Sequence, residues 1–180
     1  MDMPGRRNSL RELLIREIHE KDNAAVEQVI RSCLKEYGAD HEGTAWCDPD
    51  LGRFSKIYQA EGTRYWVAED ACGRIAGGTG IGILPEVEKT CELQKMYLLP
   101  EYRGTGTAHR LLETALSFAG KYYDFCYLET LENMKEAQRF YEKHGFCRID
   151  EKLGDTGHFD CDVRYRKDLR SFRKEDRESG

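Results

Sequence analysis

Long apolar runs are missing from this sequence of 180 residues. A membrane-spanning helix needs roughly 20 consecutive apolar residues, and no such run occurs. An apolar signal core near the N-terminus is missing as well. We therefore expect a protein that is neither secreted nor inserted in a membrane, and its expected location is the cytoplasm.

Paired cysteines are also missing. The seven cysteines are an odd number, they are scattered singly, and no C-x-x-C pair occurs among them. Zinc sites and redox-active dithiols typically use such pairs. We expect reduced thiols and no metal site. Cys91 and Cys161 fall in predicted strands and are expected to be small core residues rather than nucleophiles.

An excess of positive charge is missing too. The formal net charge is -5 and the isoelectric point is about 5.6. Because neutralising many phosphates needs a basic face, this balance argues against a nucleic-acid-binding protein. Cationic small molecules suit it better as ligands.

No internal repeat or low-complexity tract divides the chain. Two separate cores would both be small at this length, so we predict one domain over residues 12–168. The polar ends, residues 1–11 and 169–180, lack apolar periodicity and are expected to be flexible tails. Exposed edge strands would make a homodimer of this domain plausible.

Apolar periodicity in the first half predicts two helices followed by an antiparallel meander. One helix lies between Asp22, a typical N-cap, and Gly38, a typical stop, and a second is expected to begin at Asp48 and Pro49. The predicted strands are residues 13–18, 64–69, 74–84 and 90–99.

The second half predicts a crossover to a parallel strand and a final strand pair. Strand-helix-strand order makes the strand after the crossover parallel to the last strand of the meander. Asn133 is expected to cap a fourth helix that stops at Gly145. The fold class is therefore mixed α/β (α+β), with a mostly antiparallel sheet of about seven strands flanked by about four helices. The predicted elements are a helix over 108–119 and strands over 124–130, 146–151 and 159–167.

The strand over residues 90–99 carries a break in its alternation. Cys91 and Leu93 mark one face, but the next apolar residues, Met96 and Leu98, are displaced by one position. A β-bulge around residues 94–95 explains the displacement, because one extra residue reverses the faces of all that follow. A bulge also frees backbone groups that an extended, amide-bearing ligand can pair with.

A glycine-containing turn, R-G-T-G-T-A at residues 103–108, precedes the crossover helix. Small residues and the unpaired N–H groups of a first helical turn favour a bound anion such as a pyrophosphate. One alternative is a tight turn without a ligand, and another is a dinucleotide site with Glu129 as the ribose-binding acid. His109 at the third glycine position argues against the dinucleotide site.

These two segments together resemble the GNAT superfamily of N-acetyltransferases. The turn is similar to the R-x-x-G-x-G/A motif for acetyl-CoA, and N-M-K-E-A-Q-R-F-Y-E-K-H-G-F at 133–146 resembles the second signature of that superfamily. The resemblance implies a GNAT-like sheet with a bulged fourth strand, and acetyl-CoA as cosubstrate. Many relatives carry Lys or Arg in place of Thr105, so phosphate binding is expected to be weaker here. The cofactor-binding residues that it implies are Met96, Tyr97, Leu98, Arg103, Gly104, Thr105, Gly106, Thr107, Ala108 and Asn133.

The catalytic residues that we predict are Glu92 and Tyr141. Amine acetylation needs a neutral amine, a polarised carbonyl and a proton for the departing thiolate. Glu92 is the predicted base if burial raises its pKa, and otherwise it is a surface strand residue. The resemblance places Tyr141 near the thioester sulfur as the acid, and the alternative is a core aromatic. The N–H of Leu98 is the predicted oxyanion donor.

The acceptor amine is not identified by these motifs. Polyamines, aminoglycosides, amino acids and protein amines all remain open, because acceptor specificity comes from loops. Loops carrying Trp46, Asp48, Glu86 and His158 are expected to border the acceptor pocket, and none of these residues is a predicted catalyst. The alternative for His158 is an ordinary turn residue. The alternative function is a non-catalytic acyl-CoA-binding regulatory module on the same fold.

Overall fold

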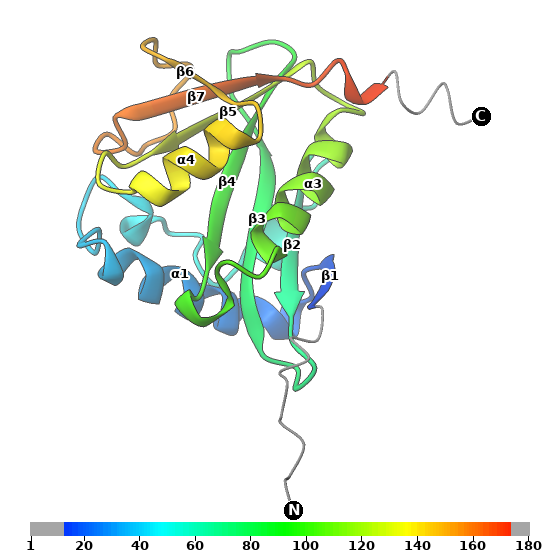
Figure 1. Cartoon of the computed structure of the whole chain (residues 1–180), viewed down its shortest axis with the longest axis vertical. Helices are drawn as coiled ribbons and strands as arrows, with labels where there is room; N and C mark the ends of the chain where they lie inside the picture. The colour runs from blue at the N-terminus through cyan, green and yellow to red at the C-terminus, as the bar shows by residue number, and fades with distance from the viewer. Residues whose placement is uncertain (1–12, 174–180) are drawn as a thin grey trace, which may run out of the picture.

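The computed structural model describes residues 13–173, which form one seven-stranded sheet in the order β1-β2-β3-β4-β5-β7-β6 (Figure 1). Strands β1 to β4 form an antiparallel meander, and β5, β7 and β6 are also antiparallel to one another. The single parallel pair is β4 and β5, which confirms the predicted crossover. The strands are β1 (Leu14–Glu17), β2 (Arg64–Glu69), β3 (Ile75–Ile83), β4 (Thr90–Leu98), β5 (Phe125–Thr130), β6 (Cys147–Ile149) and β7 (Val163–Asp168).

Helices cover both faces of this sheet (Figure 1). Helix α1 packs on one face against β3 and β4, where its apolar stripe joins Tyr65 and Val67 of β2 in one core layer. Helix α3 packs on the other face, in a second layer that also receives Tyr141 from α4. The helices are α1 (Asn23–Glu36), α2 (Phe54–Ile57), α3 (Thr107–Ala119) and α4 (Lys135–Lys143), with short 3-10 turns η1 (Glu20–Asp22), η2 (Ala45–Cys47) and η3 (Pro100–Tyr102). The mixed fold with seven strands and four α-helices is as predicted.

Helix α1 begins directly after Asp22, as its sequence predicts, but the aspartate does not cap the helix with its side chain. Instead its carboxylate accepts hydrogen bonds from Arg16 Nη1 at 2.7 Å and from the backbone N–H of His19 at 2.8 Å. Arg16 also donates through Nε to Glu69 at 2.6 Å. This ion-pair chain ties the entry of α1 to the edge of the sheet.

Several predicted boundaries are wrong. The helix expected from Asp48 and Pro49 is a single turn that begins at Phe54, because Gly52 adopts a left-handed φ of 84° that a helix cannot include. The last strand begins at Val163 rather than at residue 159. Asn133 does not cap α4, since Met134 holds that position and Asn133 Nδ2 donates to the carbonyl of Tyr37 at 2.9 Å.

The C-terminal limit of the packed chain also differs from the prediction. Leu169 is fully buried and Phe172 packs against the core. Arg173 donates to the carbonyl of Gly120 at 2.8 Å. The packed part of the chain therefore continues past residue 168, whereas residues 1–12 and 174–180, and with them most of the predicted tails, lie outside the described residues.

Replacing Leu112 by alanine tests the core layer under α3. Leu112 is fully buried, so truncation should lower the free energy of unfolding by about 2–5 kcal/mol. The matched control is Leu14→Ala, because Leu14 is 58% exposed and its truncation should change stability by less than about 1 kcal/mol. Urea denaturation measures both, and equal losses would contradict this assignment of the core.

Candidate active site

The predicted β-bulge is present in β4 and centres on Lys95. Gln94 pairs with Gly80 of β3, but Tyr97 pairs with Gly78, so two residues of β4 oppose one residue of β3. Lys95 has a φ of 50°, which is uncommon for a residue with a side chain. Its carbonyl accepts a hydrogen bond from the buried hydroxyl of Tyr65 at 3.0 Å.

The glycines of β3 make room for the aromatic layer that supports this bulge. A Cβ atom on Gly80 would lie 2.8 Å from the ring of Tyr65 and 2.9 Å from the ring of Tyr58. Tyr58 in turn donates from its hydroxyl to Gln94 Oε1 at 2.8 Å. Glycine at this position therefore allows two tyrosines to lie flat on β3 and to reach β4.

A cavity opens where β4 leaves β5. The parallel pairing ends at Glu92 and Tyr127, and beyond that point the two strands run apart (Figure 1). The cavity between them has a volume of about 290 Å³. The predicted site residues that line it are Glu92, Met96, Tyr97, Leu98, Arg103, Gly104, Ala108 and Tyr141.

The backbone of Leu98 faces this cavity. The N–H of Leu99 donates to the carbonyl of Ala76 on β3, so strand alternation directs the N–H of Leu98 away from β3 and toward the cavity. The Leu98 carbonyl already accepts from Arg103 Nε at 2.9 Å. Of the two backbone polar groups of Leu98, only the N–H is therefore available to a ligand.

The turn before α3 is built from backbone rather than from positive charge. Gly104 and Gly106 have φ values of 72° and 84°, and Gly106 is the N-cap of α3. The guanidinium of Arg103 is bound to the carboxylate of Glu36 at 2.6 and 2.8 Å. An anion here would consequently depend on the first N–H groups of α3. Thr105, Gly106, Thr107 and Asn133 do not line the cavity.

Tyr141, on α4, also lines the cavity. It is 8% exposed, and its ring packs against Phe140, Phe146 and Tyr165. Among residues 13–173 its hydroxyl makes no hydrogen bond, and burial raises the pKa of this phenol. The hydroxyl keeps its proton at neutral pH and has no protein acceptor for it.

Glu92 lies deep on the other side of the bulge. It is 7% exposed, and its Oε2 accepts from Gln94 Nε2 at 2.7 Å. Burial raises the pKa of this carboxyl, against the lowering effects of the Gln94 hydrogen bond and the Lys95 charge. A carboxyl with a raised pKa is suited to exchange protons nearer to neutrality.

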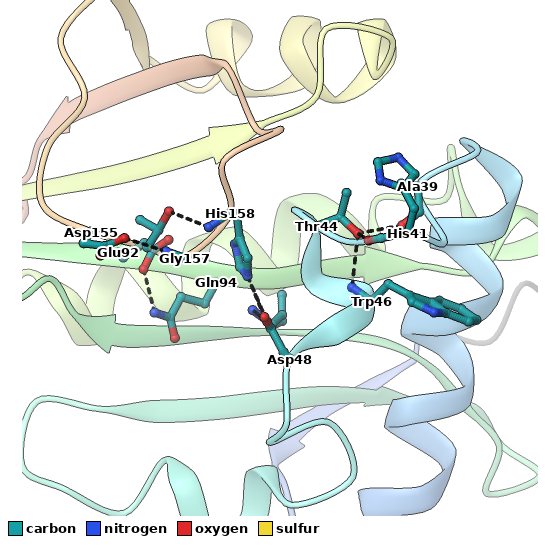
Figure 2. Close-up of polar contacts among 12 residues, drawn as sticks. Ala39, His41, Thr44, Trp46, Asp48, Glu92, Gln94, Asp155, Gly157 and His158 are labelled. Carbon is teal, nitrogen blue, oxygen red and sulfur yellow. Dashed lines mark hydrogen bonds and ion pairs between the residues drawn. The ribbon is translucent and has the colours of Figure 1, made fainter.

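Two loops, one carrying Asp48 and the other His158, meet at one side of the cavity. Their contact is drawn in Figure 2. His158, in the loop between β6 and β7, contacts both carboxylate oxygens of Asp48 at 2.8 and 2.9 Å. Asp48 also forms an ion pair with Lys95 Nζ at the bulge. Of the loop residues predicted to border this side, His158 lines the cavity, whereas Trp46, Asp48 and Glu86 do not.

Glu129 is a cavity residue to which the transferase reading of the sequence gave no role. It lies on β5, two residues after Tyr127, so the side chains of Glu129 and Tyr127 lie on the same face of the sheet. Glu92 shares that face, because it is the register partner of Tyr127. Both carboxylate oxygens are buried and have no hydrogen-bond partner among the described residues. Strand alternation predicts which face of the sheet Glu129 lies on, but it does not predict that the carboxylate lacks a hydrogen-bond partner.

Comparison with known proteins identifies the family of this chain. The family model of the acetyltransferase (GNAT) domain matches residues 61–148. The uncharacterized N-acetyltransferase YjgM of Escherichia coli (strain K12) is 42% identical over 159 residues, which cover 87% of this chain and 95% of that protein. The chain belongs to the GNAT acetyltransferase superfamily.

Solved structures of GNAT proteins share the fold. A GNAT acetyltransferase from Staphylococcus aureus Mu50 matches with a TM-score of 0.75 and 24% identity, covering 88% of this chain and 99% of that one. The PaiA N-acetyltransferase of Thermoplasma acidophilum, solved with coenzyme A, matches with a TM-score of 0.65 and 20% identity, covering 87% and 98%.

The span matched by the GNAT domain includes some parts of the site and not others. Glu92, the bulge, Glu129 and Tyr141 lie within residues 61–148, whereas Asp48 and His158 lie outside. Within residues 13–173, no helix is long and apolar enough to span a membrane. The same residues contain no group of three or more candidate metal ligands.

Replacing Asp48 by asparagine tests the contact between the two loops. Burial alone would raise the pKa of Asp48, but hydrogen bonds and charges from His158 and Lys95 outweigh it, and the pKa is lowered from 3.8. A carboxyl whose pKa is lower in the folded than in the unfolded state stabilises the fold at pH values above its unfolded-state pKa. This stabilisation is lost as pH falls through the folded-state pKa.

We therefore expect Asp48→Asn to lose about 1–3 kcal/mol of unfolding free energy at pH 7. The difference from the wild-type protein should shrink as pH falls below about 4. Denaturant unfolding at pH 7 and at acid pH measures it. The control is Asp50→Asn, because the side chain of Asp50 is 44% exposed and its ion pair, with Arg53 at 3.5 Å, lies within its own loop. A difference that does not depend on pH would contradict the ionised contact.

Proposed function

We propose that this GNAT protein transfers an acetyl group from acetyl-CoA to a primary amine by direct attack. The observation that carries the proposal is one cavity that holds an unpaired backbone N–H at Leu98, an unpaired phenol at Tyr141 and a buried carboxyl at Glu92. These are the oxyanion donor, the acid and the base that the reaction needs.

The donor side of the cavity fits an acyl-CoA. Beyond the bulge, the edge of β4 that faces the cavity is not paired with β5, so its amides are open to the amides of a pantetheine arm. The first N–H groups of α3 favour a phosphate group. The structural neighbour PaiA was solved with coenzyme A, which supports the same class of donor.

In the proposed reaction, the neutral amine forms a bond to the thioester carbon, and the C–S bond breaks. Glu92 takes one proton from the substrate ammonium, directly or through water, and Tyr141 gives its phenolic proton to the sulfur as the C–S bond breaks. The nitrogen loses a second proton as the amide forms, and that proton restores the phenol of Tyr141. The Leu98 N–H stabilises the charge that develops on the carbonyl oxygen. No acyl-enzyme is needed, and the buried thiol of Cys91 takes no part.

The proposed donor also indicates where in the cell the protein works. Acyl-CoA donors and reduced thiols are features of the cytoplasm, and all seven cysteines are free in the structure. We therefore propose the cytoplasm as the location.

Replacing Tyr141 by phenylalanine tests the acid. Removal of a general acid should lower turnover by about 10²–10⁴-fold while the affinity for CoA stays within about threefold. Thiol release from acetyl-CoA with a panel of amines measures turnover, and calorimetry measures CoA binding. Tyr122→Phe is the matched control, because Tyr122 lies outside the cavity and is 40% exposed.

The same two measurements separate the catalytic proposal from its alternative. CoA binding without thiol release for any amine would favour a regulatory acyl-CoA-binding module. Unchanged turnover in Tyr141→Phe would remove this residue as the acid.

The pH dependence of turnover tests Glu92. Because burial raises the pKa of this carboxyl, its base form is lost as pH falls, at a higher pH than for an ordinary glutamate. At saturating amine, turnover should rise as pH passes through the raised pKa of Glu92 and should then level off. Glu92→Gln should lower turnover and abolish this rise with pH. If the rise persists in the variant, another group is responsible for it.

A further inference from the structure

The acceptor side of the cavity contains more negative charge than the transfer reaction uses. Glu92 serves as the proposed base, and Asp48 is matched by Lys95 and His158. Glu129 also lines the cavity, and both of its buried oxygens are without a partner in the described part of the chain.

Neighbouring cations do not account for Glu129. Arg164 is its register partner on β7, but no hydrogen bond or ion pair joins the two side chains, and the Nε of Arg164 is itself buried and unpartnered among the described residues. The Nη1 of Arg164 donates instead to the carbonyl of Asp150 at 3.0 Å, and Arg164 does not line the cavity. Lys95 is held by Asp48. A buried carboxylate without a partner is costly, and a ligand that supplies a cation would remove this cost.

The reacting amine cannot supply that cation throughout the reaction. It must lose its proton before it attacks the thioester, so it becomes neutral at the step where the complex has to remain bound. A second ammonium, which does not react, would stay charged and remain paired with Glu129.

The spacing of the two carboxylates suits a short aliphatic diamine. Glu92 is opposite Tyr127 in the parallel pair, and Glu129 is two residues farther along the same face of β5. Strand geometry places the two backbones about 8 Å apart, and more where the strands diverge. Carbon chains of a few methylenes bridge such a gap, and apolar parts of Tyr97 and Leu131, which pack on the α1 side of the sheet, line the same cavity.

We infer that Glu129 binds a second, unreacting ammonium group of the acceptor, and that the acceptor is therefore an aliphatic diamine or longer polyamine. This inference depends on the proposed acetyl transfer for its assignment of the reacting amine. Glu129 is a specificity-determining residue on this account, and Glu92 remains the base.

Calorimetry on the full-length protein saturated with CoA tests the inference without requiring turnover. The probes are 1,4-diaminobutane, butylamine and 4-aminobutanoate. We expect 1,4-diaminobutane to bind at least about tenfold more tightly than butylamine, and 4-aminobutanoate to bind most weakly, because its carboxylate would meet Glu129.

In Glu129→Gln the preference for the diamine should disappear, with its affinity reduced by at least about tenfold and the affinity for CoA unchanged. Unchanged CoA affinity also shows that the variant is folded. Glu151→Gln is the matched control, since Glu151 is exposed and does not line the cavity. Equal binding of diamine and butylamine, no binding of either, or an unaltered preference in Glu129→Gln would overturn the inference.

Thiol release decides the proposed function separately. Release with butylamine at the rate seen for the diamine, at saturating amine and equal affinity, would leave acetyl transfer standing and overturn the role of Glu129. Diamine binding that depends on Glu129, but without thiol release for any amine, would support the binding site and overturn the proposed catalysis.

Discussion

The extra residue at Lys95 in β4 is the constraint on which the rest of the site depends. Without it, β4 would continue alongside β5, and Met96 and Leu98 would lie on the wrong face of the sheet. With it, the parallel pairing stops at Glu92, a cavity opens, and the N–H of Leu98 remains unpaired within it. A left-handed φ at a lysine is unfavourable, so other contacts must hold it in place.

Those contacts also connect the bulge to the loops beside the cavity. The hydroxyl of Tyr65 donates to the Lys95 carbonyl from the buried aromatic layer, and the carboxylate of Asp48 pairs with the Lys95 side chain from a loop. Asp48 also contacts His158 (Figure 2). Lys95 of the bulge is therefore joined through Asp48 to both loops. The shape of the cavity and the position of these two loops are thus coupled through a single backbone irregularity.

Much of this arrangement could be predicted because it depends on local periodicity. The displaced alternation around Gln94 predicts the bulge, and helical spacing predicts α1 and α3, since each pattern reports which face of an element is buried. The expected helix after Pro49 failed because a left-handed glycine, Gly52, interrupts it. The expected cap at Asn133 failed because its amide has a distant acceptor in Tyr37.

The remaining parts of the site depend on contacts between distant residues. Asp48 and His158 are 110 positions apart, and Arg103 and Glu36 are 67 apart, so no local pattern pairs them. The sequence placed Arg103 among the anion-binding residues, but its guanidinium is held by Glu36. Alternation assigns Glu129 to a face, whereas its lack of a partner depends on where Arg164 and Lys95 form their own contacts.

The central claim is that the bulge opens β4 to an acyl-CoA. A crystal structure of the protein with CoA tests it most directly. The account predicts that the pantetheine arm lies between β4 and β5, pairs with backbone groups of residues 96–98, and brings the sulfur to the hydroxyl of Tyr141. CoA bound elsewhere, or a sulfur remote from Tyr141 with the cavity empty, would contradict it.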